Sequence, residues 1–365
     1  EMRVVRSPDL IHWEPSPLNP VLKASAQDKQ IANPKLTTEQ RQRVTKAENI
    51  NNSDIDFCEY EGRLVINYSW GNQRGEEFLA ETVYEGTAEE FLRGWFPPDA
   101  LRGETKPLLV IEPSDAYPRH SEGDLIELKD GRLCLIYTRF TGGGSDHAAA
   151  DLVMRTSADD GATWSAPETV VRRTGGLNVM SVSLLRMASG EIALFYLRKT
   201  SQEDCRPVMC VSTDEMRTWS EPTDCITDEV GYYVLNNDRA VQLTSGRIVL
   251  PVAWHQGPGR PRDSAGIIMC YLSDDNGRTW RRSQDTFKGC DPDGRRITVQ
   301  EPGVVELRDG RLMMYIRTDA GSQYICHSQD GGQTWSKPRP SDLASPLSPA
   351  SIERIPWTGD LVCVW

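Results

Sequence analysis

The stretch Ser273-Asp274-Asp275-Asn276-Gly277-Arg278-Thr279-Trp280 decides the fold, because the chain repeats it. Three more copies keep its Ser-x-Asp start and its Thr-Trp end, at 157–164, 212–219 and 328–335, and a degenerate copy spans 7–13. The tryptophans that end the four full copies are 55, 61 and 55 residues apart. Self-similarity at a nearly constant spacing of this size indicates a repeat architecture.

Each copy has the composition of a turn. Aspartate can bond to its own backbone two residues on, glycine supplies a positive φ, and tryptophan can pack the turn against its sheet. We therefore interpret the motif as a folding device and not as a ligand site.

Ahead of each copy lies a pair of strand-like runs joined by Asp-Gly, Ser-Gly or Glu-Gly. These pairs span 55–68, 124–137, 183–196, 240–250 and 302–315. Such turn dipeptides between β-branched and aromatic residues indicate β-hairpins. One hairpin followed by a motif-bearing hairpin gives four strands per repeat, which is a propeller blade.

The repeats predict an all-β fold: a six-bladed β-propeller with four-stranded antiparallel blades, forming a single domain over 1–365. Five blades are complete, at about 50–97, 119–168, 177–222, 234–283 and 299–338. The sixth joins the C-terminal hairpin 350–365 to the N-terminal strands 2–16, and this closure removes exposed sheet edges. Segments 20–49, with a helix-like run at 37–43, and 85–105 are expected to be insertions.

Charge and composition narrow the function. The net charge is −12 and no run of Lys or Arg exists, which argues against nucleic acid as a partner. No apolar stretch approaches the roughly 20 residues that span a bilayer, and the chain starts without a signal-peptide pattern. The nine scattered cysteines form no zinc motif, so we expect reduced thiols, no metal or cofactor, and a cytoplasmic location. Secretion stays open if a leader was removed, and the oligomeric state is not determined.

Charged and polar residues recur at two equivalent positions of the blades. Inner strands of a propeller converge on one face, so residues that open strand one and end strand two of successive blades should meet. The second strands end with Trp70, Arg139, Arg198, Trp254-His255 and Arg317. The first strands open with Asn52 and Asp54, Arg119-His120 and Glu122, Asn178, Asn237-Asp238-Arg239, and Glu301.

Several arginines that converge in an acidic protein indicate an anion site, because guanidinium binds carboxylate in a bidentate manner. An acidic sugar held by arginine between two protein carboxyl groups is what glycoside hydrolysis needs. The candidate substrate-binding residues are Arg119, Arg139, Arg198, Arg239, Arg317, Trp70, Trp254, His147 and His255.

The candidate acid/base is Asp146, in the glycine-rich loop 139–147, with Glu301 or Asp54 as the second carboxyl group. His120 is a rival for proton transfer at neutral pH. Structural roles stay open as well. The arginines could bridge blades, Glu301 could pair with Arg317, and Asp146 could be a solvated loop residue.

The turn motif with this strand pattern resembles the sialidase (neuraminidase) superfamily, whose Asp-box or BNR repeats decorate a six-bladed propeller. The resemblance implies an arginine triad for the substrate carboxylate, an aspartic acid/base on a loop, and a tyrosine nucleophile activated by a glutamate. It places the glutamate at Glu301, the second arginine at Arg317 and the acid/base at Asp146.

The chain also departs from that pattern. Arg119 lies about two residues upstream of the first-arginine position, and Asn51-Asn52-Ser53-Asp54 stands where the tyrosine is expected. Arg3 or Arg6 is the candidate third arginine.

The sequence therefore predicts a sialidase-like glycoside hydrolase that removes a terminal acidic sugar, sialic acid or a related one, from a glycan. Its partner would be a small-molecule or oligosaccharide substrate with an anionic group. One alternative is a uronate-specific glycosidase, or a polysaccharide lyase that uses His120 and Tyr117. The other is a propeller that binds a carbohydrate or a protein without cleaving it.

Overall fold

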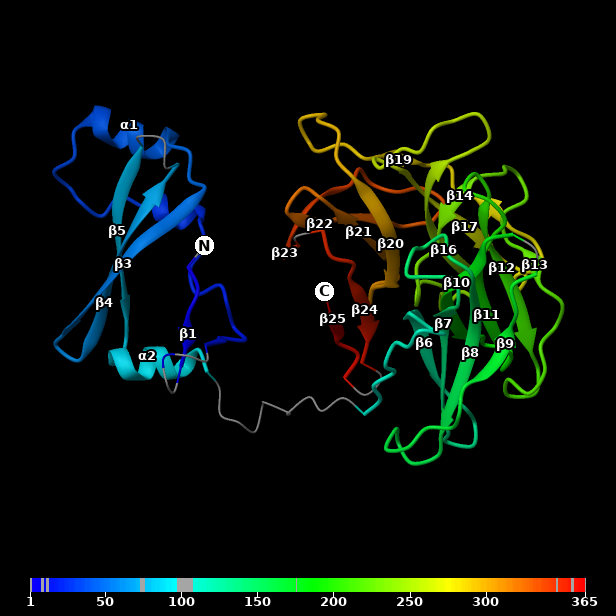
Figure 1. Ribbon diagram of the computed structural model, residues 1–365. Helices are drawn as coiled ribbons and strands as arrows, with labels where there is room; N and C mark the ends of the chain where they lie inside the picture. Colours follow the sequence, from blue (N-terminus) through cyan, green and yellow to red (C-terminus); the bar gives the residue numbers. More distant parts are fainter. Residues whose placement is uncertain are drawn as a thin grey trace. The chain divides into compact units, whose positions relative to one another are not determined.

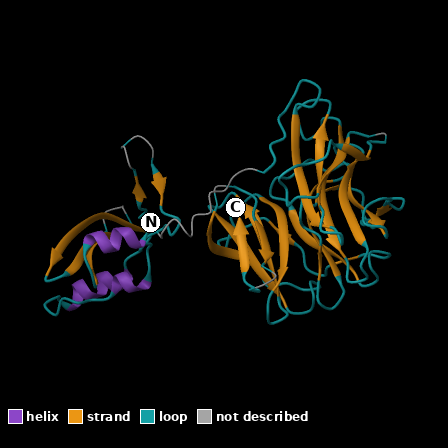
Figure 2. Cartoon of the chain, turned by 90° about the horizontal axis from the view of Figure 1, so that it is seen from below, coloured by secondary structure: helices purple, strands orange, loops and turns teal. Residues whose placement is uncertain are grey.

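The computed structural model describes residues 2–7, 10, 13–72, 76–96, 108–174, 176–345, 347–355 and 358–364. The chain divides into two compact units, Glu1–Lys106 (unit 1) and Pro107–Trp365 (unit 2), shown in Figure 1. Strands predominate in the described residues, and Figure 2 shows that the helices belong to unit 1. The all-β class is thus confirmed, while the single domain over 1–365 stays a prediction.

Unit 1 contains one three-stranded antiparallel sheet and one short hairpin. The sheet has the order β3 (Asn51–Tyr60), β4 (Arg63–Gly71) and β5 (Glu77–Tyr84). The hairpin pairs β1 (Val5–Arg6) with β2 (Glu14–Pro15). The helical segments are η1 (Ala26–Lys29), α1 (Thr38–Lys46) and α2 (Ala88–Gly94).

Helix α1 confirms the helix-like run at 37–43. Thr37 accepts a hydrogen bond from the backbone N–H of Gln40, and the Gln40 side chain accepts one from the backbone N–H of Thr37. This reciprocal capping box satisfies two amide donors at the start of the helix and so stabilises a helix in which Val44 is the one apolar residue.

Unit 2 begins and ends with the repeats that the sequence predicts. Four strands form the first sheet: β6 (Arg119–Glu127), β7 (Leu133–Phe140), β8 (Ala150–Ser157) and β9 (Glu168–Val171). Another four-stranded sheet consists of β20 (Val299–Glu306), β21 (Leu312–Thr318), β22 (Ser322–Ser328) and β23 (Arg339–Ala344). The C-terminal hairpin pairs β24 (Ser351–Arg354) with β25 (Leu361–Val364).

The two middle repeats are joined into one ten-stranded sheet by a parallel contact between Cys205 and Tyr232. The first of them contains β10 (Asn178–Arg186), β11 (Ile192–Lys199), β12 (Cys205–Ser212) and β13 (Thr223–Asp224). The second contains β14 (Tyr232–Val234), β15 (Val241–Gln242), β16 (Ile248–Gln256), β17 (Ile267–Ser273), β18 (Arg281–Arg282) and β19 (Phe287–Lys288).

Apolar cores lie between successive repeats of unit 2. One contains Ile136 of β7 and Leu194 of β11, the next Phe195 of β11 and Leu250 of β16. A third joins β16 to β21, and a fourth joins β21 to β24. Because the sheets pack face to face, first strands of neighbouring repeats come into contact, as β6 does with β10 and β20 with β24.

The Ser-x-Asp turns are folding devices, as their composition predicts. In the copy at 273–280, the Asp275 carboxylate accepts hydrogen bonds from the Thr279 amide at 2.8 Å and the Thr279 hydroxyl at 2.7 Å. Trp280 Nε1 donates to the Gly277 carbonyl at 3.1 Å. The aspartate and threonine make the same two bonds in the copies at 157–164, 212–219 and 328–335.

A strained backbone position recurs in five repeats, inside the first strand in four of them and between β14 and β15 in the fifth. Five non-glycine residues there have positive φ: Asp54 (52°), Glu122 (53°), Ser181 (60°), Asp238 (56°) and Glu301 (47°). Four of them coincide with a shift in strand register. Such bulges re-aim side chains, and strained positions gather at functional sites.

No helix of the described residues is long and apolar enough to cross a bilayer. All nine cysteines are unpaired, and six of them are buried.

Candidate functional site

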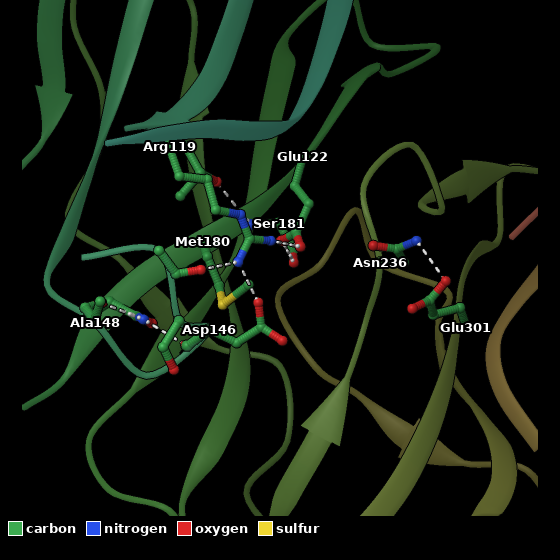
Figure 3. A network of polar contacts seen from close by, with 12 residues as sticks. Arg119, Glu122, Asp146, Ala148, Met180, Ser181, Asn236 and Glu301 are labelled. Atoms are coloured by element: carbon green, nitrogen blue, oxygen red, sulfur yellow. Dashed lines mark hydrogen bonds and ion pairs between the residues drawn. The ribbon is translucent and has the colours of Figure 1, made fainter. Parts of the chain in front are cut away.

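Arg119, at the start of β6, joins two carboxylates. Its Nη1 lies 2.5 Å from Oδ1 of Asp146 and its Nη2 lies 3.4 Å from Oε1 of Glu122, as Figure 3 shows. The guanidinium also lies over the Phe140 ring, 4.5 Å from its centre. The bulge at Glu122 brings the two β6 side chains to one face, although they are three residues apart.

Glu122 was named from the sequence only among the residues that open the first strands and was not considered as an acid. Its side chain is 21% exposed, and Oε2 accepts a 2.6 Å hydrogen bond from the Ser181 hydroxyl. Burial raises the pKa of Glu122, and the charges of Asp146 and Glu301 raise it further against the opposing effects of Ser181 and Arg119. The sequence did contain a signal for this role, since Glu122 occupies the same position in its repeat as Glu301, which was named as a candidate carboxyl group.

Asp146 lies in the glycine-rich loop between β7 and β8. Burial raises the pKa of Asp146, but the hydrogen bond and charge of Arg119 outweigh it, so the pKa lies below its ordinary value. The backbone of the loop is fastened as well. Asn178 Nδ2 donates to the carbonyls of Asp146 and Ala148, each at 2.8 Å.

Lys199 fastens the same loop from β11. Its side chain is buried, and Nζ donates to the Asp146 carbonyl at 2.6 Å, contacts Met180 Sδ at 3.3 Å and lies 5.1 Å from the centre of the Tyr232 ring. Within the described parts of the chain it forms no ion pair with a carboxylate, and burial lowers its pKa. The loop therefore rests on a desolvated ammonium group.

A second arginine–carboxylate pair joins β20 to β21. Arg317 Nη1 lies 2.6 Å from Oε1 of Glu301, whose other oxygen accepts from Asn236 at 3.2 Å. Arg317 also donates through Nε to the Leu347 carbonyl at 2.9 Å. Because the charge of Glu301 affects the pKa of Glu122, the two pairs belong to one electrostatic neighbourhood.

The other predicted arginines contact neighbouring strands. Arg139 donates to Thr169 of β9 at 3.2 Å and stacks on the Tyr117 ring at 4.4 Å. Arg198 pairs with Asp224 of β13. These bonds run across a repeat, away from the Arg119 group, because successive side chains alternate between the two faces of a strand.

Arg239 is buried and links two repeats. Its Nη2 donates to the Ala350 carbonyl at 2.6 Å, and its Nη1 donates to the Ser351 hydroxyl at 3.2 Å. This is the bridging role that the sequence left open. Substrate contact by Arg139, Arg198 or Arg239 stays a prediction.

The three predicted histidines differ in surroundings. His120 packs edge-on against Tyr137, and burial together with Arg139 lowers its pKa. His147 packs edge-on against Tyr232, with ring centres 6.2 Å apart. The buried His255 ring donates through Nδ1 to the Asp263 carbonyl at 2.7 Å, which fixes its tautomer.

Asp54 and Trp70 lie in unit 1, so their part in a common site with Arg119 stays a prediction. Asp54 is exposed and accepts a 2.9 Å hydrogen bond from Ser53. Trp70 is buried, stacks on Phe78 with centres 4.8 Å apart, and lines a cavity of about 840 Å³ in unit 1. Across the described residues, no cluster of three or more His, Cys, Asp or Glu side chains suits a metal ion.

Antiparallel repeats with Ser-x-Asp turns, which carry arginine–carboxylate pairs on their first and second strands, are typical of the class of Asp-box proteins. The sequence pattern of one family, described as "BNR repeat-like domain", matches residues 131–357. That is more than half of the chain, and the protein therefore belongs to the BNR repeat-like family, within the sialidase superfamily. The superfamily that the sequence motif predicts is thus confirmed.

Two curated relatives are called sialidases. The sialidase of Micromonospora viridifaciens is 26% identical to this chain over 287 residues, and the alignment covers 71% of this chain and 42% of the relative. The sialidase of Bacteroides fragilis is 29% identical to this chain over 146 residues, and the alignment covers 39% of this chain and 24% of the relative. The chain thus spans less than half the length of each.

Solved structures show the same fold at low sequence identity. The intramolecular trans-sialidase of Ruminococcus gnavus superposes with a TM-score of 0.52 at 15% identity, covering 65% of this chain and 74% of that one. The NanB sialidase of Streptococcus pneumoniae superposes with a TM-score of 0.52 at 14% identity, and the match covers 80% of this chain and 69% of that one. A protein of unknown function from Dyadobacter fermentans superposes with a TM-score of 0.54 at 20% identity, and the match covers 68% of this chain and 75% of that one.

Proposed function

We propose that this protein is a sialidase-like glycoside hydrolase that removes a terminal acidic sugar, sialic acid or a related one, from an oligosaccharide. The observation that carries the proposal is that Arg119 holds two carboxyl groups whose pKa values move in opposite directions, Glu122 upward and Asp146 downward. Two carboxyl groups whose pKa values are shifted in opposite directions are typical of the acid and its ionised partner in a glycosidase.

The substrate carboxylate would bind Arg119 and Arg317, which are 28% and 22% exposed. Both already hold protein carboxylates, so each has the planar set of donors that a ligand carboxylate requires. Support for an acidic sugar also comes from the sialidase names of the relatives, and the net charge of −12 makes local arginines the natural anchor.

In the proposed reaction, Glu122 is the acid and gives its proton to the glycosidic oxygen as the bond to the leaving group breaks. Asp146, held ionised by Arg119, is the second carboxylate and takes a proton from the water that attacks the opposite face of the sugar. Asp146 then releases this proton to solvent, and solvent protonates Glu122 again. The roles differ from the expectation that Asp146 is the acid, because the ion pair with Arg119 opposes its protonation.

The fold of this enzyme would be the closed six-bladed propeller. The hairpin β24–β25 has no third or fourth strand of its own within the described residues, and β1–β2 forms an isolated pair of strands. Joining the two in one blade would cover the open edges of both. The cytoplasmic location expected from the cysteines belongs to the proposal as well.

A panel of sialosides and uronate-capped oligosaccharides tests the function through release of free sugar. Wild type is compared with Glu122→Gln, Asp146→Asn and the surface control Glu168→Gln. Turnover of a sialoside that both site variants lose and the control keeps would support the proposal. No release from any member would refute it.

A polysaccharide lyase is the second candidate, favoured by one observation. His120 has a lowered pKa, so it is neutral at pH 7 and able to accept a proton, and its ring centre is 6.4 Å from that of Tyr117. The same panel separates the two, because a lyase leaves an unsaturated sugar that absorbs in the ultraviolet and a hydrolase does not.

A further inference from the structure

The loop 257–266, between β16 and β17, carries two arginines that stack on aromatic rings. The guanidinium carbon of Arg260 lies 5.2 Å from the centre of the Trp254 ring, and that of Arg262 lies 5.3 Å from the centre of the Tyr232 ring. Both arginines are exposed. Stacking holds a guanidinium in one plane while leaving its edge donors open to solvent.

These two arginines lack a counter-charge among the described residues. Neither forms an ion pair with a described carboxylate, whereas other arginines of unit 2, such as Arg186, Arg247 and Arg296, do. The chain as a whole carries a net charge of −12. Two neighbouring cations without acidic partners in such a protein form a local site for an anion.

The base of the loop is held in place by Asp263. Its backbone N–H donates to the His255 carbonyl at 2.7 Å, and its own carbonyl accepts from the His255 ring at 2.7 Å. Its carboxylate accepts from the Ala265 amide at 2.9 Å and pairs with Arg296. The conformation that presents Arg260 and Arg262 is therefore organised before any ligand binds, which lowers the entropic cost of binding.

Tyr232 connects this loop with the loop of Asp146. Its ring centre lies 5.3 Å from the guanidinium carbon of Arg262 and 5.1 Å from Nζ of Lys199, and His147 packs against the ring with centres 6.2 Å apart. Lys199 in turn binds the Asp146 carbonyl at 2.6 Å. The stacked arginines thus lie beside the proposed catalytic group.

We propose that Arg260 and Arg262, stacked on Trp254 and Tyr232, form a second anion subsite, for a carboxylate or sulfate on the sugar next to the one that is removed. The inference rests on the proposed glycosidase function and deepens it, because it makes the substrate an oligosaccharide with at least two anionic groups.

The test uses matched substrates that share a terminal acidic sugar and differ in the sugar next to it, which is neutral, carboxylated or sulfated. Wild type should cleave one of the acidic forms with a kcat/KM about 10-fold above the neutral form, as expected for one or two charge-assisted contacts. The variant Arg260→Ala/Arg262→Ala should lose this preference and keep the neutral rate. The control Arg278→Ala removes an exposed arginine from a turn elsewhere and should keep the preference. Equal rates for all wild-type substrates, or a preference that survives in the double variant, would overturn the proposal.

Binding of the same saccharides to the full chain, measured by calorimetry, keeps the subsite testable if no cleavage occurs. Tighter binding of the doubly anionic saccharides that the double variant loses and Arg278→Ala keeps would support the subsite even though the hydrolase proposal had failed. Equal binding of neutral and acidic forms would refute the subsite. Unchanged thermal unfolding of the variants would show that a loss does not come from misfolding.

Discussion

The Ser181 hydroxyl donates a 2.6 Å hydrogen bond to Glu122, and both residues occupy the strained positive-φ position of their own repeat. They belong to β10 and β6, the first strands of neighbouring repeats, which contact each other. The repeated bulge therefore turns two side chains from different sheets toward one point. In this way a structural repeat creates a local polar site.

Replacing Glu122 by Gln should lower kcat/KM by roughly 100- to 10,000-fold, because glutamine cannot donate the proton that the leaving oxygen needs. Since burial raises the pKa of Glu122, the active protonated form is lost at a pH above that of an ordinary glutamate. The basic limb of the pH–rate profile should therefore disappear in the variant. Glycosides with a good leaving group should lose much less activity, and an equal loss for all leaving groups would contradict the acid role.

Replacing Arg119 by Met should raise the pKa of Asp146, because the hydrogen bond and charge that hold it ionised are removed. If Asp146 acts as a carboxylate, the acid limb of the pH–rate profile moves to higher pH in this variant. The Michaelis constant for an acidic sugar should rise about 10- to 100-fold, in line with the loss of a charge-assisted pair. Arg119→Lys keeps the positive charge, so its acid limb should lie close to that of the wild type, but its affinity for the acidic sugar should stay low because lysine lacks the planar fork of donors. An unmoved acid limb would argue against an ionised Asp146 in catalysis.

Lys199 is expected to position Asp146 through the loop backbone. Lys199→Met keeps the length and the apolar stem and removes the donor to the Asp146 carbonyl. We expect kcat to fall about 10-fold with little change in KM, because the misplaced carboxylate affects the chemical step more than binding. The exposed Lys129, changed to Met, is the control. If Lys199→Met lowers only the thermal stability and leaves kcat unchanged, Lys199 stabilises the fold and does not position Asp146.

The contribution of Asp124 to the stability of the fold should decrease as the pH rises from about 4 to 7. Burial and then the neighbouring Asp238 raise the pKa of Asp124 from 3.8 to about 7, and Glu353 adds to this. A carboxyl group with a raised pKa binds its proton more tightly in the folded chain. Its contribution is complete below the unfolded pKa and is lost as the pH passes through the folded one.

Asp238→Asn tests this directly, since asparagine tolerates the positive φ of that position and carries no charge. The pKa of Asp124 should fall in the variant, and thermal unfolding between pH 4 and 7 should become less dependent on pH. Asp160→Asn, on an exposed turn with φ of 55°, is the matched control. The same pH dependence in all three proteins would refute the coupling.

Several site residues could be found from the sequence because the repeat itself places them. Glu301 and Arg317 sit at fixed distances from a turn glycine, and the structure joins them in one ion pair. Asp146 was found through its glycine-rich loop and lies against Arg119. Arg139 and Arg198 end second strands as Arg317 does, yet they bond to other strands, because one residue of shift along a strand reverses the face to which a side chain points. Arg239, which opens a first strand, bonds instead to the C-terminal hairpin.

What the sequence by itself determined is the all-β repeat, its strands, its turns and its superfamily. These follow from short-range rules of turn chemistry and strand periodicity, which act over a few residues and recur in every copy. Only the tertiary structure decided that Glu122 is bonded to Ser181, that Lys199 holds the Asp146 loop and that Arg262 stacks on Tyr232. Burial and charge between distant residues set those relationships and the pKa values that follow from them, and no local pattern along the chain records which surfaces will be desolvated together.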